Sequence, residues 1–225
     1  MIPIVEIFRS IQGEGCKTGV PTLFVRVAGC NLAEEKNSPC AYCDTGYSWK
    51  KDDGEPGTVE DIRSQVDMAM KSTGLRDICL TGGEPLWHEE VKDLIYWWNK
   101  TYDLTVETNG SLPIWPLPWA CWSVDIKCPS SGNADYNDLT NLAIVQSKDQ
   151  VKFIISDKKD YKFARKIVMS RSILAPIIFQ PSWKVMPAKK LAKWLVEDVK
   201  LNRVSSVRLG MQMHKVIWPA KTRGV

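Results

Sequence analysis

The sequence predicts an α/β fold in which βαβ units build a parallel sheet. Two observations lead to this prediction. Short apolar runs rich in Val, Ile, Leu and Phe alternate with amphipathic stretches along almost the whole chain of 225 residues, as expected for strands that alternate with helices. Polar and glycine motifs also follow the ends of successive predicted strands, which is where ligands bind in parallel sheets and barrels.

The predicted elements follow one another without a linker or an internal repeat. Apolar, partly β-branched runs predict strands over 22–28, 77–80, 104–107, 122–126, 151–155, 175–179 and 206–209. Helical periodicity predicts helices over 58–72, 89–100, 157–170 and 188–200. Thr58 and Asp61 have the spacing of an N-terminal capping box at the first helix. We therefore expect one domain over residues 1–225, with an N-terminal lead-in at about 4–21 and a short C-terminal extension at 219–225.

Composition excludes several classes of protein. Hydrophobic residues make up 44% of the chain and charged residues 25%, which is ordinary for a globular protein. No apolar run is long enough to span a membrane, and the N-terminus lacks a signal-peptide layout, so we expect a cytoplasmic protein. The net charge of +4 is scattered, and even the run Lys158-Lys159-Asp160 contains an acid. We read these charges as a solvated surface, without direct nucleic-acid contact.

The seven cysteines form an odd and unevenly spaced set. This argues against a disulfide framework in a chain of this size. Four of them are expected to be free thiols in apolar surroundings, namely Cys16, Cys79, Cys121 and Cys128.

The other three cysteines lie together as Cys30-x9-Cys40-x2-Cys43. A closed zinc site would need a fourth ligand, but His88 and His214 lie far away in sequence and no second Cys-x2-Cys exists. Three thiolates suit a [4Fe–4S] cluster that leaves one iron open to a small molecule. Spacing alone favours iron–sulfur and leaves zinc as the alternative.

The neighbouring motifs give the cysteines a context. Val27-Ala-Gly-Cys30, Cys40-Ala-Tyr42-Cys43 and Thr81-Gly-Gly-Glu-Pro85 together resemble the radical S-adenosylmethionine (SAM) superfamily. The resemblance implies a partial TIM-like β/α barrel of about six parallel strands and a [4Fe–4S] cluster on the three cysteines. It also implies that Tyr42 lies near the SAM adenine and that Gly83 and Glu84 contact SAM.

The chain departs from the usual superfamily spacing, because nine residues rather than three separate the first two cysteines. Closing the longer loop costs only about 1 kcal/mol. Since the additional segment, 31–39, is polar, we expect a surface excursion that leaves the cluster intact.

A closer resemblance rests on Ile11-Gln-Gly-Glu-Gly15, Cys43-Asp-Thr45 and Met211-Gln-Met-His-Lys215. These motifs resemble the 7-carboxy-7-deazaguanine synthase family, and the resemblance runs from about Ile4 to Trp218. It implies conversion of 6-carboxy-5,6,7,8-tetrahydropterin to 7-carboxy-7-deazaguanine with loss of ammonia, in 7-deazapurine (queuosine or archaeosine type) biosynthesis. Mg²⁺, a homodimer and a reductant protein such as a flavodoxin or ferredoxin are also implied.

The family's residue roles carry over to matching positions. The resemblance implies substrate contacts from Gln12, Gly13, Glu14, Arg26 and Thr81, and a Mg²⁺ contact from Thr45. It implies SAM contacts from Asp125, Lys127, Gln180 and Ser182, although in the Asp125–Lys127 segment only the lysine matches the usual Ser-Pro-Lys. Structural roles compete with these assignments: the 12–15 segment could be a simple turn, Arg26 could close an internal salt bridge, and Thr45 could cap a turn.

Two further functions compete with this one. A radical SAM activase that generates a glycyl radical on a partner protein would share the cysteines and the Gly-Gly-Glu segment. It would not need the Gln-Gly-Glu-Gly segment, Arg26 or the Gln-x-His-Lys segment. A zinc-stabilised binding module would need no catalytic residues at all.

Overall fold

The computed structural model describes residues 1–205, 207–219 and 222–224 and contains one nine-stranded sheet. The strands lie in the spatial order β3, β1, β2, β4, β5, β6, β7, β8, β9. Their bounds in chain order are β1 Ile2–Ile11, β2 Pro21–Val27, β3 Glu55–Gly57, β4 Asp77–Gly82, β5 Asp103–Thr108, β6 Cys121–Ile126, β7 Gln150–Ile155, β8 Ile177–Pro181 and β9 Val207–Leu209. The order begins and ends on different strands, so the sheet is open.

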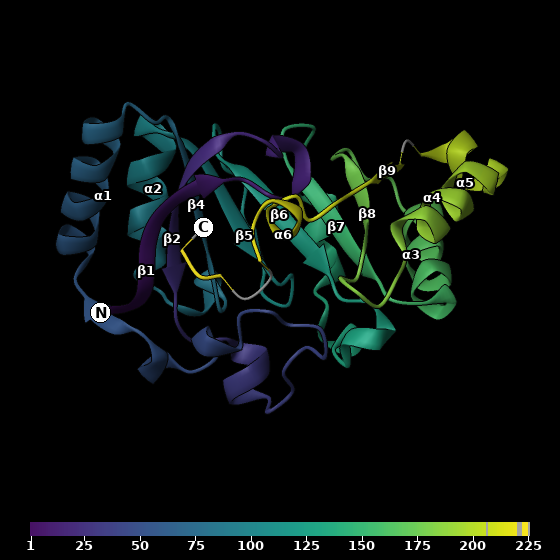
Figure 1. Ribbon diagram of the computed structural model, residues 1–225, viewed down its shortest axis with the longest axis horizontal. Helices are drawn as coiled ribbons and strands as arrows, with labels where there is room; N and C mark the ends of the chain where they lie inside the picture. Colours follow the sequence, from purple (N-terminus) through teal and green to yellow (C-terminus); the bar gives the residue numbers. More distant parts are fainter. Residues whose placement is uncertain (206, 220–221, 225) are drawn as a thin grey trace.

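The parallel part of the sheet confirms the predicted α/β class. Within the described residues, seven strands pair in parallel from β2 through β4 to β9, where about six were expected. The predicted strand over 206–209 appears as β9, although Ser206 lies outside the described residues. The curved, incomplete sheet fits the expected partial barrel (Figure 1).

The N-terminal lead-in is a strand that sequence analysis did not predict. β1 pairs antiparallel with β2 on one side and with β3 on the other, and its register with β2 shifts between Ile4 and Glu6. Pro3 and the charged Glu6 and Arg9 interrupt its apolar pattern. The pairing of such a strand is decided by its neighbours on both sides and leaves a weak signal in the sequence.

The helices are α1 Val59–Thr73, α2 Val91–Thr101, α3 Lys158–Ser170, α4 Ala188–Glu197, α5 Val199–Val204 and α6 His214–Ile217. Thr58 Oγ1 accepts a hydrogen bond from the backbone N–H of Asp61, which confirms the predicted cap. The single helix expected over 188–200 is in fact two helices. They divide at Asp198, whose carboxylate accepts from the Leu201 N–H and begins α5.

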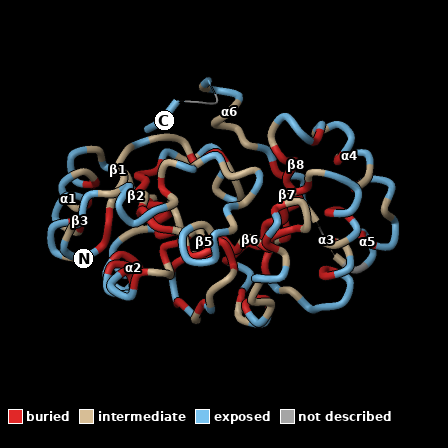
Figure 2. The backbone as a smooth tube through the Cα atoms, turned by 90° about the horizontal axis from the view of Figure 1, so that it is seen from below, coloured by how far each residue is buried: buried red, intermediate tan, exposed pale blue. Residues whose placement is uncertain are grey.

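The curved sheet has an outer and an inner side. Helices α1–α5 lie around its outside, whereas α6 and the residues near the C-terminus lie over its inner side (Figures 1 and 2). On β7 the alternate residues Val151, Phe153 and Ile155 are completely buried among apolar neighbours, so Lys152 between them faces the inner side. Among the described residues, no helix has the length and apolarity required to cross a membrane.

Candidate active site

The inner side of the sheet holds a cavity of about 890 Å³. Ligand cavities usually lie within about 300–1,000 Å³, so this one is large enough for more than one small molecule. Residues at or just beyond the carboxyl ends of successive parallel strands line it: Arg26, Thr81, Glu107, Asp125, Ile154 and Ser182. The motifs that follow the predicted strands therefore meet in one place.

Most of the residues singled out from the sequence line this cavity. They are Gln12, Gly13, Glu14, Arg26, Cys30, Cys40, Tyr42, Cys43, Thr45, Thr81, Gly83, Asp125, Lys127 and Ser182. Two others, Glu84 and Gln180, do not line it, and both are completely buried. The cavity brings the residues together, while their individual roles stay predictions.

Glu84 was expected at the ligand, but its carboxylate has internal partners. The backbone N–H of Asn109 donates at 2.6 Å, the Thr108 hydroxyl at 2.9 Å and the Leu86 N–H at 3.0 Å. Burial raises the pKa of Glu84 to about 7, although these three donors and Lys127 oppose the rise. The carboxylate therefore joins the Gly-Gly-Glu turn to the end of β5. Residue spacing in the sequence does not reveal this structural role.

Gln180, the other residue outside the cavity lining, is a completely buried residue of β8 in register with Ile154. Among the described residues, neither its amide nitrogen nor its amide oxygen has a hydrogen-bond partner. Ser182 follows two residues later, where its N–H donates to the Ile155 carbonyl at 2.9 Å and places it at the cavity. Of the expected SAM-contacting turn, Ser182 therefore lines the cavity and Gln180 does not.

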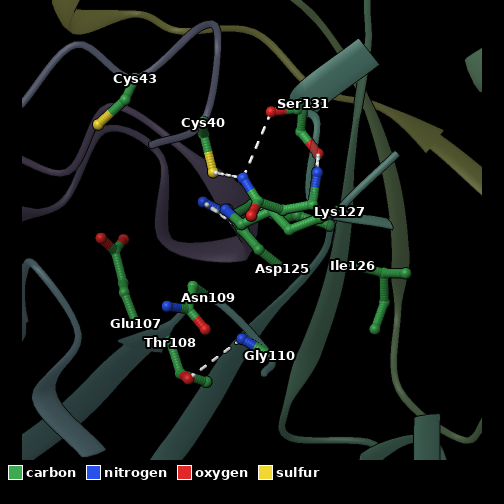
Figure 3. A network of polar contacts seen from close by, with 12 residues as sticks. Cys40, Cys43, Glu107, Thr108, Asn109, Gly110, Asp125, Ile126, Lys127 and Ser131 are labelled. Atoms are coloured by element: carbon green, nitrogen blue, oxygen red, sulfur yellow. Dashed lines mark hydrogen bonds and ion pairs between the residues drawn. The ribbon is translucent and has the colours of Figure 1, made fainter. Parts of the chain in front are cut away.

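The three clustered cysteines line the same end of the cavity, and Figure 3 shows Cys40 and Cys43 facing the space above Glu107 and Asn109. Burial raises the pKa of the Cys30 and Cys40 thiols, so metal binding would have to displace their protons. In the described part of the chain, no three His, Cys, Asp or Glu side chains gather closely enough for one metal ion. A [4Fe–4S] cluster makes a different demand, since each cysteine binds a different iron, and three thiols around one cavity fit it.

The loop before Cys40 differs in part from the expected surface excursion. Asn31 and Leu32 are buried at its start, and Asn31 accepts from Asn109 Nδ2 at 2.9 Å and donates to the Ser111 hydroxyl at 2.9 Å. Residues 34–37 are exposed as predicted. The additional segment is therefore held at its first residue, Asn31, next to Cys30, by these two hydrogen bonds. Among the remaining cysteines, Cys16 is exposed rather than in apolar surroundings.

A chain of opposite charges runs along the cavity floor. Lys152 Nζ lies 2.8 Å from a Glu14 oxygen and 3.4 Å from an Asp125 oxygen, and Lys127 Nζ lies 3.0 Å from the other Asp125 oxygen. Asp125 and Lys152 are register partners on neighbouring parallel strands. Burial alone would raise the pKa of Glu14, but Lys152 and the amide of Gln212 bring it to about 2. Glu14 is therefore a fixed anion.

Arg26 closes the internal salt bridge considered from the sequence and also lines the cavity. Its Nε donates to Glu6 at 2.7 Å, so the internal salt bridge exists. Its guanidinium also lies over the rings of Phe8 and Tyr47, 5.6 and 5.8 Å from their centroids, and lines the cavity. The ion pair and the rings hold a cation at the cavity wall.

Sequence reasoning missed two charged residues of the site, Glu107 and Lys152. Glu107 accepts from the Thr81 hydroxyl at 2.8 Å and from Gln12 Nε2 at 3.3 Å. It directly precedes the Thr-Asn-Gly segment that ends β5. Lys152, like Arg26, is a charge inside an otherwise apolar strand, and that pattern was the available signal.

The C-terminal part of the chain closes the cavity from the inner side. The N–H of Met213 donates to the Gly13 carbonyl at 2.9 Å, and a Cβ on Gly13 would lie 2.0 Å from His214 Nδ1. Further on, Arg223 lies over the Tyr47 ring at 3.9 Å and lines the cavity. Glycine at position 13 is therefore required by close packing of the two terminal segments.

Comparison with known proteins agrees with this geometry. The Radical SAM superfamily description matches residues 24–116, which include all three clustered cysteines. A 7-carboxy-7-deazaguanine synthase of Koribacter versatilis is 34% identical and covers 99% of each chain. One of Methanospirillum hungatei is 35% identical and covers 95% of this chain and 84% of the relative. The crystal structure of QueE from Escherichia coli matches with a TM-score of 0.70 at 22% identity, over 95% of this chain and 94% of that one. At that identity it supports the fold.

The fold, the cysteine set and the superfamily match together define a radical SAM protein, which implies a [4Fe–4S] cluster and SAM. Identity of 34% over nearly the full length carries the classification further. The chain belongs to the 7-carboxy-7-deazaguanine synthase family. The named relatives support the deazaguanine synthase function and do not favour the activase.

Proposed function

We propose that this protein converts 6-carboxy-5,6,7,8-tetrahydropterin to 7-carboxy-7-deazaguanine, with loss of ammonia. One observation carries the proposal. A single cavity is lined both by the three clustered cysteines and by a polar set formed by Gln12, Glu14 and Arg26. A cofactor and a flat, charged substrate can therefore be held side by side and away from water.

The polar set suits a carboxylated pterin. Arg26 offers a guanidinium to the substrate carboxylate, and its pairing with Glu6 keeps that group in place. Glu14 is held as an anion by Lys152 and can accept from ring N–H groups. Gln12 is oriented by Glu107 and can pair with the remaining edge of the ring. Substrate orientation is thus assigned to these side chains.

The other end of the cavity suits the cofactors. Cys30, Cys40 and Cys43 would hold the cluster, while Tyr42, Lys127 and Ser182 border the space for SAM. When bound, the cluster and SAM would supply the radical chemistry that starts the reaction on the pterin. The chain's own contribution is to orient the two molecules and to exclude solvent, with Arg223 and its neighbours covering the inner side.

We also propose that Mg²⁺ assists, with the Thr45 hydroxyl as one ligand. Mg²⁺ prefers oxygen ligands and keeps several waters, so one protein hydroxyl plus substrate oxygens would suffice. Thr45 lines the cavity, and its Oγ1 lies 3.5 Å from Cys43 Sγ. Thr45 thus lies beside the third cysteine of the set. A homodimer, a cytoplasmic location and a flavodoxin or ferredoxin as electron donor complete the proposal by family resemblance.

The test is anaerobic reconstitution with iron and sulfide, followed by incubation with SAM, reductant, Mg²⁺ and the carboxypterin. We expect 7-carboxy-7-deazaguanine by mass spectrometry, and 5′-deoxyadenosine. Cys43→Ala should lose SAM cleavage completely, whereas Cys16→Ser, a change at an exposed cysteine away from the cavity, should keep it. A protein that binds stoichiometric zinc and takes up no iron would contradict the proposed function.

A further inference from the structure

The three clustered cysteines share a feature that neither the fold nor the substrate contacts require. Each sulfur has one side-chain N–H donor within hydrogen-bonding reach. Trp49 Nε1 lies 3.1 Å from Cys43 Sγ, Asn133 Nδ2 lies 3.4 Å from Cys40 Sγ, and Asn109 Nδ2 lies 3.8 Å from Cys30 Sγ. The donors come from three separate segments, so no single turn explains the pattern.

Two of the three donors make the shorter contacts to sulfur. Trp49 Nε1 donates to Cys43 at 3.1 Å, and its ring lies beside Gly46, where an ideal Cβ would be 3.5 Å from the nearest ring atom. Asn133 is completely buried, and its Oδ1 has no partner among the described residues, while its Nδ2 lies 3.4 Å from both Cys40 Sγ and the Ser131 carbonyl. A buried amide with an unmet oxygen is costly, so the site retains Asn133 at some expense. Asn109 is weaker, because its amide also donates to Asn31 at 2.9 Å.

We infer that Trp49 and Asn133, with a smaller part from Asn109, raise the reduction potential of the bound cluster. The inference deepens the proposed function and rests on it. When the [4Fe–4S]²⁺ cluster accepts one electron from a low-potential reductant, the added negative charge is shared with the cysteine sulfurs. Hydrogen bonds to those sulfurs stabilise the reduced form and raise the potential. Their effect is larger in a buried site, where water screens little.

Neutral donors have an advantage over cations in this position. Lys127 already faces the cysteine end of the cavity and attracts the Cys30 and Cys40 thiolates, but its ammonium is paired with Asp125. An indole or an amide is neutral and therefore adds no charge that would attract or repel SAM or the substrate. The donors can therefore set the potential without changing ligand binding, and this separates their role from that of the cavity-lining charges.

The experiment compares the midpoint potentials of reconstituted proteins by EPR-monitored redox titration without SAM. Trp49→Phe removes the indole N–H and keeps an aromatic ring, and Asn133→Ala removes the amide. Trp119→Phe is the matched control, because that ring is 68% exposed and does not line the cavity. At equal iron and sulfide content, we expect the clusters of Trp49→Phe and Asn133→Ala to have more negative midpoint potentials than the wild-type cluster. The control should be unchanged.

Two outcomes would overturn the inference. Midpoint potentials equal to wild type in both variants would mean that the donors do not act on the cluster. Loss of iron binding in both variants, with the control loading normally, would make them part of the ligand scaffold instead. Failure of the proposed function looks different, because the wild-type protein itself would then assemble no [4Fe–4S] cluster or form no deazaguanine.

Discussion

The ammonium of Lys152 lies 2.8 Å from the carboxylate of Glu14, although 138 residues separate the two in the chain. Lys152 belongs to β7 and Glu14 to the turn after β1, so the contact joins the parallel part of the sheet to its antiparallel edge. The same ammonium reaches Asp125 on β6 at 3.4 Å. One buried cation, Lys152, thus pairs with two carboxylates of the cavity, those of Glu14 and Asp125.

Lys152→Met should destabilise the protein by about 3 kcal/mol at neutral pH, because it leaves buried carboxylates without their partner. The pKa of Glu14 is about 2 in the folded state, below its ordinary 4.5. Its contribution to stability is therefore complete above pH 4.5 and is lost as the pH falls toward 2. The difference between variant and wild type in urea unfolding should narrow over that window. Lys193→Met, at an exposed pair with Glu197, should change little, and an equal loss there would contradict the role of Lys152.

Glu84→Gln should change the pH dependence of stability in the opposite sense. Burial raises the pKa of Glu84 to about 7 from its ordinary 4.5, so between these values the folded state binds more protons than the unfolded state. Stability then falls as the pH rises through the window. Glutamine cannot ionise, so the free energy of unfolding of the variant should improve relative to wild type by up to about 3 kcal/mol between pH 5 and pH 8. Parallel stability curves for the two proteins would show that Glu84 does not titrate there.

Arg26→Ala should raise the KM for the carboxypterin by about tenfold to a hundredfold, as expected for the loss of a charged hydrogen bond. The Kd for SAM should change far less, because Arg26 pairs with Glu6 and is not among the residues expected to contact SAM. Equilibrium dialysis with SAM and steady-state kinetics measure the two effects. Glu6→Gln is the control for the salt bridge alone. Equal losses of SAM and substrate binding in Arg26→Ala would make the arginine structural.

Thr45→Val should weaken the stimulation of turnover by Mg²⁺, since valine keeps the shape of threonine and lacks its oxygen. Thr45→Ser keeps the hydroxyl and should retain most of the response. The measurement is the Mg²⁺ concentration that gives half-maximal activity at constant cluster content. If valine and wild type respond alike, Thr45 is not a magnesium ligand and serves the turn that begins with the Ser48 N–H bond to its carbonyl.

The sequence by itself determined the parallel α/β fold, because alternating apolar runs and helical periodicity are local patterns. It also located the cysteines, and most of the candidate site residues that it indicated line the cavity, since glycine and polar motifs at strand ends stand out from their neighbours. The spacing of Thr58 and Asp61 also correctly predicted the N-terminal cap of the first helix. These features depend on residues a few positions apart, which one sequence displays.

Only the tertiary structure decided which of these residues face the cavity and what holds them there. The Glu84 carboxylate does not line the cavity, because it accepts hydrogen bonds from Thr108 and Asn109 at the end of the next strand, β5. The role of Lys152 in the site also depends on the fold, because its partner Glu14 lies 138 residues earlier in the chain. Contacts across such separations depend on strand order and register, and an individual sequence carries no local signal of either.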